Sequence, residues 1–299
     1  MSIDLSKMPK LGFGLMRLPE KDGKIDIEHV SRMVDKYMNA GLNYFDTAYV
    51  YHGGTSEVAA REAIVKHYPR ESFMLATKLP AWELKQESDV ERVFNEQLTR
   101  AGVDYFDFYL LHSVEDGFNY DNYVKYNCFE WCMQRKAEGK IKHFGFSFHG
   151  SPELLEKILD NNPEVEFVQI QFNYLDRTNP VVRSQMLYDI LYKRNIPIIV
   201  MEPVRGGMLA NLGDEVDAKF KARQPEKSIA SWALRFVASQ PGIMTILSGM
   251  SAEEQMDDNI RTFTNFETLA EDEVKLHRRS DSGDSQHPAD RLHILQILL

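Results

Sequence analysis

Short apolar runs alternate with longer amphipathic segments from residue 10 to about residue 250. The short runs are rich in β-branched and aromatic residues, as buried strands are, whereas the longer segments repeat their apolar residues with helical spacing. This alternation is typical of repeated βα units in a parallel sheet. We predict eight strands: Lys10–Leu15, Asn43–Thr47, Phe73–Lys78, Phe106–His112, Lys142–Ser147, Phe167–Gln171, Pro197–Met201 and Ile243–Ser248.

Helical segments lie between these strands, and some begin with residues that favour a helix N-terminus. Ser88, Ser151 and Asn179 stand where a side chain can cap free backbone N–H groups, and Pro152 and Pro180 suit the first helical turn. The predicted helices are Ile27–Asn39, Ser56–Lys66, Asp89–Arg100, Tyr123–Ala137, Pro152–Leu159, Pro180–Lys193 and Lys227–Ala238.

The order of these elements predicts an α/β protein that forms a closed (β/α)8 TIM barrel. A chain of 299 residues is long enough for one such barrel. An open, doubly wound sheet is the alternative, because counting strands does not distinguish the two folds. We assign residues 1–270 to the barrel and residues 271–299 to a C-terminal helix remnant and an irregular tail.

Charge and composition limit the partners that the protein can have. The formal net charge of −10 argues against nucleic acid or an anionic membrane surface as a main partner. The start of the chain lacks an apolar leader region, and no apolar run approaches the roughly 20 residues that span a bilayer. We therefore expect a cytoplasmic protein that acts on a small molecule, and the sequence leaves its oligomeric state open.

The two cysteines, Cys128 and Cys132, lie four residues apart inside a predicted helix. That spacing is unsuited to a stabilising disulfide, so we expect two reduced thiols.

Reactive side chains gather at the carboxyl ends of the predicted strands. In a barrel all of these ends form one face, which is where active sites of this architecture lie. Each residue taken singly also has a structural interpretation, such as a buried ion pair or a core histidine. The strand-end residues are Asp46, Lys78, His112, Ser147, Gln169 and Glu202.

Three of these positions, together with Tyr51, resemble the catalytic motifs of the aldo-keto reductase family. The segment from Asp46 to Tyr51 matches the pattern D-T-A-x-x-Y, and G-x-S-E follows it, while Lys78 and His112 stand near the ends of the next two strands. The resemblance implies an NAD(P)(H)-dependent oxidoreductase that transfers hydride between a nicotinamide and an aldehyde or ketone. It also implies that Asp46, Tyr51, Lys78 and His112 are catalytic.

The chemistry explains why these residue types are needed together. A carbonyl that accepts hydride also needs a proton, and a phenol with a pKa near 10 is a poor donor. We expect Lys78 to lower the pKa of Tyr51 and Asp46 to keep that lysine charged and in place. We expect His112 to hydrogen-bond the carbonyl oxygen, orienting the substrate and stabilising the charge that develops on it.

The resemblance extends from Lys10 to about Asn265 and implies a set of cofactor contacts. Ser147 and Gln169 should bond the nicotinamide carboxamide, although Phe148 replaces the usual asparagine. Met201 stands where an aromatic residue often stacks, and its polarizable thioether can substitute. The full set of expected contacts is Gly14, Leu15, Met16, Asp46, Ser147, Gln169, Met201, Pro203, Val204, Gly206, Gly249, Gln255, Asp258 and Asn259.

The adenosine end of this set bears on the choice between NADH and NADPH. Members of the family that prefer NADPH often place Lys and Arg where this chain has Gly249 and Gln255. Without a cation at either position to bind the 2′-phosphate, the sequence favours NADH or dual use. Lys227 or Arg261 is the alternative source of such a cation.

The end of the chain differs from the subgroup that its first motif resembles. D-T-A-Y-V-Y-H-G-G is similar to a bacterial subgroup with a cysteine-rich, ferredoxin-like C-terminal extension, but no cysteine follows Cys132 here. Shifting the degenerate codons of His287–Leu299 by one base permits a C-x-x-C-x-x-C motif, so one hypothesis is a frameshifted or prematurely ended extension. The other is a native tail. In the chain as written we expect neither an iron–sulfur cluster nor another metal.

Two other classes of function stay open. The first is a module that binds a nicotinamide cofactor and reports redox state with little turnover. The second is a metal-dependent barrel hydrolase, which needs several His and carboxylate ligands at strand ends, where only His112 and Asp46 are obvious. By position, Trp82, Tyr49 and His149 are candidate walls of a substrate pocket or else ordinary loop aromatics.

Overall fold

The computed structural model describes residues 4–264 and 266–269. Its eight barrel strands are β1 (Leu11–Gly14), β4 (Tyr44–Asp46), β5 (Met74–Pro80), β6 (Phe106–Val114), β7 (Ile141–Phe148), β8 (Phe167–Gln171), β9 (Ile198–Met201) and β10 (Ile243–Ser248). All neighbouring strands are parallel, and β1 closes the barrel by pairing with both β10 and β4. The closed barrel confirms the predicted fold and excludes the open sheet.

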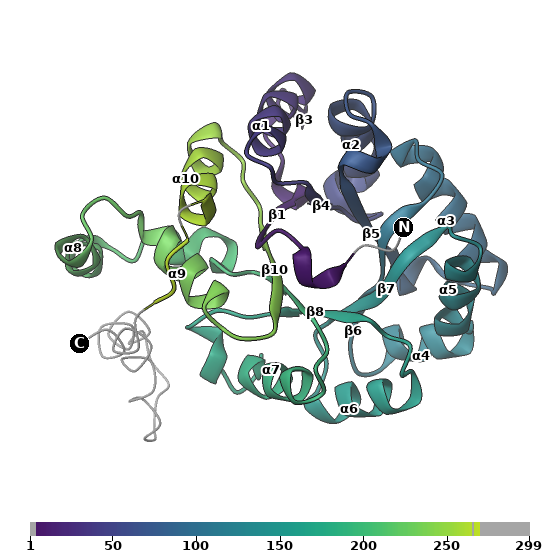
Figure 1. Cartoon of the computed structure of the whole chain (residues 1–299). Helices are drawn as coiled ribbons and strands as arrows, with labels where there is room; N and C mark the ends of the chain where they lie inside the picture. Colours follow the sequence, from purple (N-terminus) through teal and green to yellow (C-terminus); the bar gives the residue numbers. More distant parts are fainter. Residues whose placement is uncertain (1–3, 265, 270–299) are drawn as a thin grey trace.

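Helices surround the barrel (Figure 1). They are α1 (Ile27–Asn39), α2 (Ser56–Ala60), α3 (Ser88–Ala101), α4 (Phe118–Lys125), α5 (Cys128–Ala137), α6 (Pro152–Asn161), α7 (Ser184–Lys193), α8 (Asp214–Arg223), α9 (Ile229–Ala238) and α10 (Glu253–Thr264). No helix in the described part of the chain is long and apolar enough to cross a membrane. Cys128 and Cys132 are buried on α5 and form no disulfide, as expected.

Residues with left-handed φ divide or shorten two of the predicted helices. The predicted helix Tyr123–Ala137 is divided at Asn127, whose φ of 51° is left-handed and interrupts the helical hydrogen bonds. The helix predicted from Pro180 begins only at Ser184, because the side chain of Asn179 accepts hydrogen bonds from the backbone of the next turn and Arg183 is left-handed. Local side-chain bonding of this kind competes with helix formation.

The predicted helix caps have mixed outcomes. Ser151 does cap α6, accepting a hydrogen bond from the backbone N–H of Leu154 at 3.2 Å. Ser88 does not cap α3. Instead, the carboxylate of Asp89 accepts hydrogen bonds from the backbone of Lys85 and Gln86 ahead of the helix.

Several elements were absent from the sequence prediction. They are the short hairpin of β2 (Glu20–Lys21) and β3 (Lys24–Ile25), and helices α8 and α10. Helix α8 extends away from the barrel at the edge of the molecule (Figure 1), and only Val216 and Phe220 on it are buried. Two buried residues give too weak an apolar periodicity to identify a helix. The predicted tail, residues 271–299, lies outside the described residues and stays a prediction.

The interior of the barrel is filled by large side chains. Phe108 packs edge-on against Tyr44 and Phe167, with ring centroids 5.0 and 5.2 Å apart. Gly145 makes room for this packing, since a Cβ atom there would lie 2.3 Å from the carbonyl oxygen of Phe167. The barrel is therefore not a pore, and ligands are confined to the ends of the strands.

We predict that Gly145→Ala destabilises the protein by about 1–3 kcal/mol, because the added methyl group overpacks the interior. Chemical denaturation measures the change in the free energy of unfolding. Gly14→Ala is the matched control, since its Cβ would meet its nearest neighbour at an ordinary 3.5 Å. Equal denaturation midpoints for the two variants would contradict the packing argument.

Candidate active site

The four residues expected to be catalytic meet at the carboxyl end of the barrel. Asp46 ends β4, Lys78 lies in β5 and His112 in β6, while Tyr51 begins the short helix η3 (Tyr51–Gly54) that follows β4. The Nζ atom of Lys78 lies 2.6 Å from Oδ1 of Asp46 and 4.9 Å from the centroid of the Tyr51 ring. The ring of His112 stands nearly perpendicular to that of Tyr51, with centroids 5.9 Å apart. The structure thus brings all four together.

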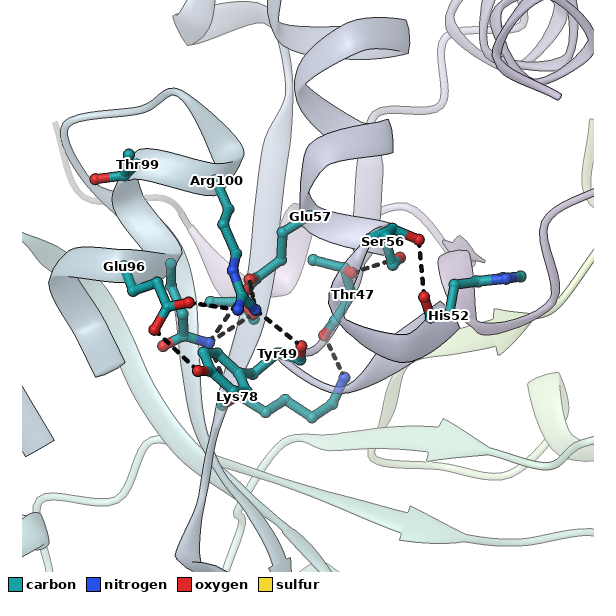
Figure 2. Close-up of polar contacts among 12 residues, drawn as sticks. Thr47, Tyr49, His52, Ser56, Glu57, Lys78, Glu96, Thr99 and Arg100 are labelled. Carbon is teal, nitrogen blue, oxygen red and sulfur yellow. Dashed lines mark hydrogen bonds and ion pairs between the residues drawn. The ribbon is translucent and has the colours of Figure 1, made fainter. Parts of the chain in front are cut away.

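Lys78 and Asp46 form an ion pair that water does not reach, with side-chain exposures of 0% and 3%. Burial acts to lower the pKa of Lys78, but Asp46 and Tyr51 outweigh burial, so that the lysine pKa is raised. Burial raises the pKa of Asp46, and the charge of Lys78 opposes this rise. Lys78 also donates to the carbonyl oxygen of Thr47 at 2.7 Å, as Figure 2 shows. These close contacts favour a charged lysine below Tyr51.

The protonation states of Tyr51 and His112 are governed first by burial. Burial raises the pKa of Tyr51 by more than Lys78 lowers it, so the net shift is upward, although the lysine acts in the expected direction. The phenol therefore holds its proton at neutral pH. Burial, followed by the charges of Lys78 and His149, holds the pKa of His112 well below its usual range. His112 is therefore a neutral imidazole, which carries one N–H donor.

A cavity of about 220 Å³ opens above these residues. Tyr51, His112 and Asp46 contribute to its wall, whereas Lys78 lies buried behind them. The other lining residues are Gly14, Met16, Arg17, Ser147, His149, Gln169, Met201, Glu202, Leu247 and Gly249.

A second cavity, of about 200 Å³, shares four lining residues with the first. The two are parts of one cleft, which the predicted cofactor contacts line from end to end. In the second cavity these contacts are Pro203, Val204, Gly206, Gly249, Gln255, Asp258 and Asn259. Leu15 is the exception among the predicted contacts, since its side chain belongs to the core and lines neither cavity.

Polar atoms at the base of the first cavity are suited to a nicotinamide carboxamide. Oε1 of Gln169 is buried and has no hydrogen-bond partner in the described part of the structure. Its Nε2 atom lies 3.5 Å from the sulfur of Met201, which joins these two predicted contacts. The hydroxyl of Ser147 accepts a hydrogen bond from the backbone of Ser113 at 2.8 Å, so its own hydrogen is free to be donated. A primary amide supplies both the donor and the acceptor that these groups lack.

An ion pair that the sequence did not reveal crosses the cleft where the two cavities meet. Nη2 of Arg17 lies 3.2 Å from Oε1 of Glu202, and both residues line both cavities. Glu202 has a left-handed φ of 55°, and Asn173 holds its carbonyl oxygen with a 3.0 Å hydrogen bond. The position of Glu202 at a strand end was a usable signal, but no local pattern in the sequence paired it with Arg17.

Only part of the expected substrate wall faces the cavity. His149 lines it, and the ring of Trp82 lies 5.3 Å from that of His112. Tyr49 does not line it, because its hydroxyl bonds Glu96 and its ring packs against Arg100, both on α3.

Within the described residues, no group of three or more His, Cys, Asp or Glu side chains could hold a metal ion, so the structure gives no support to the hydrolase alternative.

Residues 10–281 match the model of the aldo/keto reductase family. The chain belongs to this family. It is therefore an oxidoreductase of the aldo/keto reductase type, which works with a nicotinamide cofactor.

Curated relatives cover nearly the whole chain at modest identity. An uncharacterized oxidoreductase of Bacillus subtilis, YqkF, is 26% identical over 93% of this chain and 94% of its own length. L-galactose dehydrogenase of Arabidopsis thaliana is 26% identical over 90% of the chain and 89% of its own length. NADH-specific methylglyoxal reductase of Escherichia coli is 25% identical over 85% of the chain and 89% of its own length.

Solved structures share the fold. An aldo-keto reductase of Klebsiella pneumoniae in complex with NADPH superimposes with a TM-score of 0.71 at 19% identity, over 93% of each chain. The holo form of one from Bacillus halodurans gives a TM-score of 0.73 at 21% identity, over 97% of this chain and 99% of the other. At such identities the likeness establishes the barrel and nothing further about the site.

We predict that the buried neutral state of His112 makes stability depend on pH. In the unfolded chain a histidine takes up a proton below about pH 6.5, which the folded protein resists, so acid favours unfolding. Relative to His112→Asn, the wild type should lose unfolding free energy as the pH falls from 6.5 to 5, with a slope that approaches about 1.4 kcal/mol per pH unit near pH 5. Urea denaturation at each pH measures this difference. His67→Asn, at an exposed position, should keep the wild-type slope, and a His112→Asn slope equal to wild type would refute the assignment.

Proposed function

We propose that the protein is an NAD(P)(H)-dependent carbonyl oxidoreductase in which Tyr51 exchanges the proton that accompanies hydride transfer. The observation that carries this proposal is the buried Lys78–Asp46 pair beside Tyr51, at the base of a cleft that His112 also faces. A bound nicotinamide supplies or accepts the hydride. The residues of the chain position the carbonyl and handle its proton.

Tyr51 serves as the proton donor when a carbonyl is reduced. Its phenol is protonated at neutral pH, and Lys78 stabilises the phenolate that remains after the proton has left. Charge stabilisation inside a site that excludes water is much stronger than it is in solution. Asp46 holds the ammonium group in place, because a buried lysine without a partner would give up its charge.

His112 orients the substrate. A neutral imidazole can donate one hydrogen bond to the carbonyl oxygen without competing with Tyr51 as an acid. Its Nδ1 atom is buried and has no partner among the described residues, which leaves the other nitrogen for the ligand. Together, Tyr51 and His112 provide two donors to the oxygen on which negative charge develops.

The two-part cleft fits an extended dinucleotide. Ser147 and Gln169 would bond the carboxamide, and Met201 would contact the nicotinamide ring. Gly206 and Gly207, both with positive φ, expose the backbone of the turn after β9 to the pyrophosphate. The remaining proposed contacts are Gly14, Met16, Asp46, Pro203, Val204, Gly249, Gln255, Asp258 and Asn259, with only the backbone of Leu15 available.

The cleft favours NADH over NADPH. Arg17 is the only Lys or Arg among the described residues that line the second cavity, and Glu202 already pairs with it. Asp258 adds a carboxylate to the same wall, which disfavours a 2′-phosphate. Neither Lys227 nor Arg261 lines this cavity. The E. coli relative is named as NADH-specific, in agreement with this preference.

A nicotinamide-binding redox sensor with little turnover is the second candidate. It would use the same cleft but has no need of a buried cation beside a tyrosine. The assembled tetrad therefore favours the enzyme.

We predict that Tyr51→Phe lowers kcat/KM for carbonyl reduction by about 10²- to 10⁴-fold, the contribution typical of general acid catalysis. NADH oxidation would be followed with methylglyoxal, other small aldehydes and diketones, while fluorescence titration measures the Kd of the cofactor, which should change less than twofold. Tyr192→Phe is the control, because this tyrosine is exposed and lies beside the amino-terminal end of β10. Wild-type binding of NADH without turnover on any substrate would support the sensor instead.

We predict that the wild type prefers NADH and that Gly249→Lys with Gln255→Arg shifts the preference toward NADPH at least about tenfold, because phosphate gains charged partners. The ratio of kcat/KM for the two cofactors measures this shift. A wild type that already prefers NADPH would show that Arg17 leaves Glu202 to bind the phosphate.

A further inference from the structure

The last turn of helix α3 reaches toward two parts of the proposed catalytic site. Gln97 and Arg100 lie three residues apart, and thus on one face of the helix. Gln97 faces the β5 strand that carries Lys78, and Arg100 faces the loop that leads to Tyr51. Neither residue lines the cleft.

Gln97 holds the backbone of Lys78 from behind. Its Nε2 atom lies 2.9 Å from the carbonyl oxygen of Lys78 and 3.1 Å from the hydroxyl of Thr77, and its Oε1 atom accepts a 2.7 Å hydrogen bond from Tyr109. Gln97 and Tyr109 are both fully buried. The amide is thereby fixed in one orientation, with its donors directed at the strand that carries the lysine.

Arg100 and its neighbour Glu96 hold the loop that carries Tyr51. Nη1 of Arg100 donates to the carbonyl oxygen of Tyr49 at 3.2 Å, and the guanidinium lies 4.2 Å from the centroid of the Tyr49 ring. Glu96 pairs with Nη2 of Arg100 and accepts a 2.9 Å hydrogen bond from the Tyr49 hydroxyl. Figure 2 shows these side chains converging on Tyr49, two residues before Tyr51.

Glu57 links the two contacts into one unit. Its Oε1 atom accepts hydrogen bonds from Gln97 at 3.0 Å and from Thr77 at 2.6 Å, and its Oε2 atom lies 3.7 Å from Nη1 of Arg100. The side chain of Glu57 is wholly buried. Arg100 is its one cationic partner among the described residues. Burying a carboxylate is costly without such a partner.

We propose that Gln97, Arg100 and Glu57 are positioning residues that set the distance between Lys78 and Tyr51. This inference rests on the proposed roles of Lys78 and Tyr51. Gln97 holds the backbone of Lys78, and Arg100 holds the backbone of Tyr49, two residues before Tyr51. Helix α3 thereby fixes the position of the lysine relative to the tyrosine.

The physical consequence is electrostatic. The attraction between an ammonium and a phenolate depends steeply on their separation where water is excluded. The charged groups that act on Tyr51 are Lys78, Asp46 and Glu202, of which only the lysine stabilises the phenolate. The ring of His112 also packs against Tyr51, but burial lowers the pKa of His112 and keeps it neutral. Loss of a contact made by Gln97, Arg100 or Glu57 therefore weakens the stabilisation of the phenolate by Lys78 and leaves Tyr51 a weaker acid. It slows the chemical step more than it weakens the binding of NADH.

The test compares Arg100→Met and Arg100→Lys with Arg194→Met, a control that removes another partly exposed ion pair, between Arg194 and Asp160. Single-turnover NADH oxidation across a pH series gives the rate of the chemical step, and titration gives the Kd of NADH. In Arg100→Met we expect at least a tenfold slower step, a high-pH limb moved upward by about one unit, and a Kd within twofold of wild type. Arg100→Lys should restore part of the rate, and Arg194→Met should match the wild type.

Gln97→Met tests the other end of the unit and should show the same displaced pH limb. If it fails to fold, Arg100→Met decides alone, because that side chain is partly exposed. A slower step with the wild-type pH limb, or a wild-type rate, in folded Arg100→Met would overturn the inference. Tyr51→Phe separates this failure from a failure of the proposed function: full activity in Tyr51→Phe rejects both, whereas an inactive Tyr51→Phe beside a wild-type-like Arg100→Met rejects the positioning role alone.

Discussion

A buried ammonium paired with a buried carboxylate is the constraint around which this site is built. Two charges without water are destabilising unless each finds a partner at close range, and Lys78 and Asp46 lie 2.6 Å apart. The pairing of β4 with β5 brings the two side chains together, and the closed barrel keeps those strands adjacent. Lys78 also lies 4.9 Å from the centroid of the Tyr51 ring, and its charge opposes the rise that burial causes in the pKa of that tyrosine.

The barrel, the convergence of the four proposed catalytic residues and most of the cleft could be predicted because the order of strands along the chain determines which strand ends lie side by side in this architecture. Asp46, Lys78, His112, Ser147 and Gln169 each stand near the end of an apolar run, and parallel strands that close on themselves bring all such ends to one face. The prediction needed only the order of the strands, so errors in helix bounds, such as the division at Asn127, did not affect it.

Features that depend on distant residues could not be predicted in this way. The partner of Arg17 lies 185 positions away, and the orientation of Tyr49 is decided by Arg100, 51 positions away. The lowering of the Tyr51 pKa by Lys78 could be predicted, but the burial that outweighs it could not, because the sequence shows the lysine and not how deeply the tyrosine is buried. Helix α8 was missed because it buries too few side chains to leave a periodic pattern.

The packed barrel and the loops around the cleft have different roles in the proposed function. Phe108 and its neighbours fill the inside of the barrel, so the strands can present the residues of the proposed active site only at their ends. Loops such as the one bearing Glu202 form the rest of the cleft, and they alone can change shape without disturbing the ion pair below. In the proposed mechanism, selection among carbonyl substrates therefore falls to residues outside the strands, whereas the acidity of Tyr51 depends on groups within the strands and on the helix packed behind them.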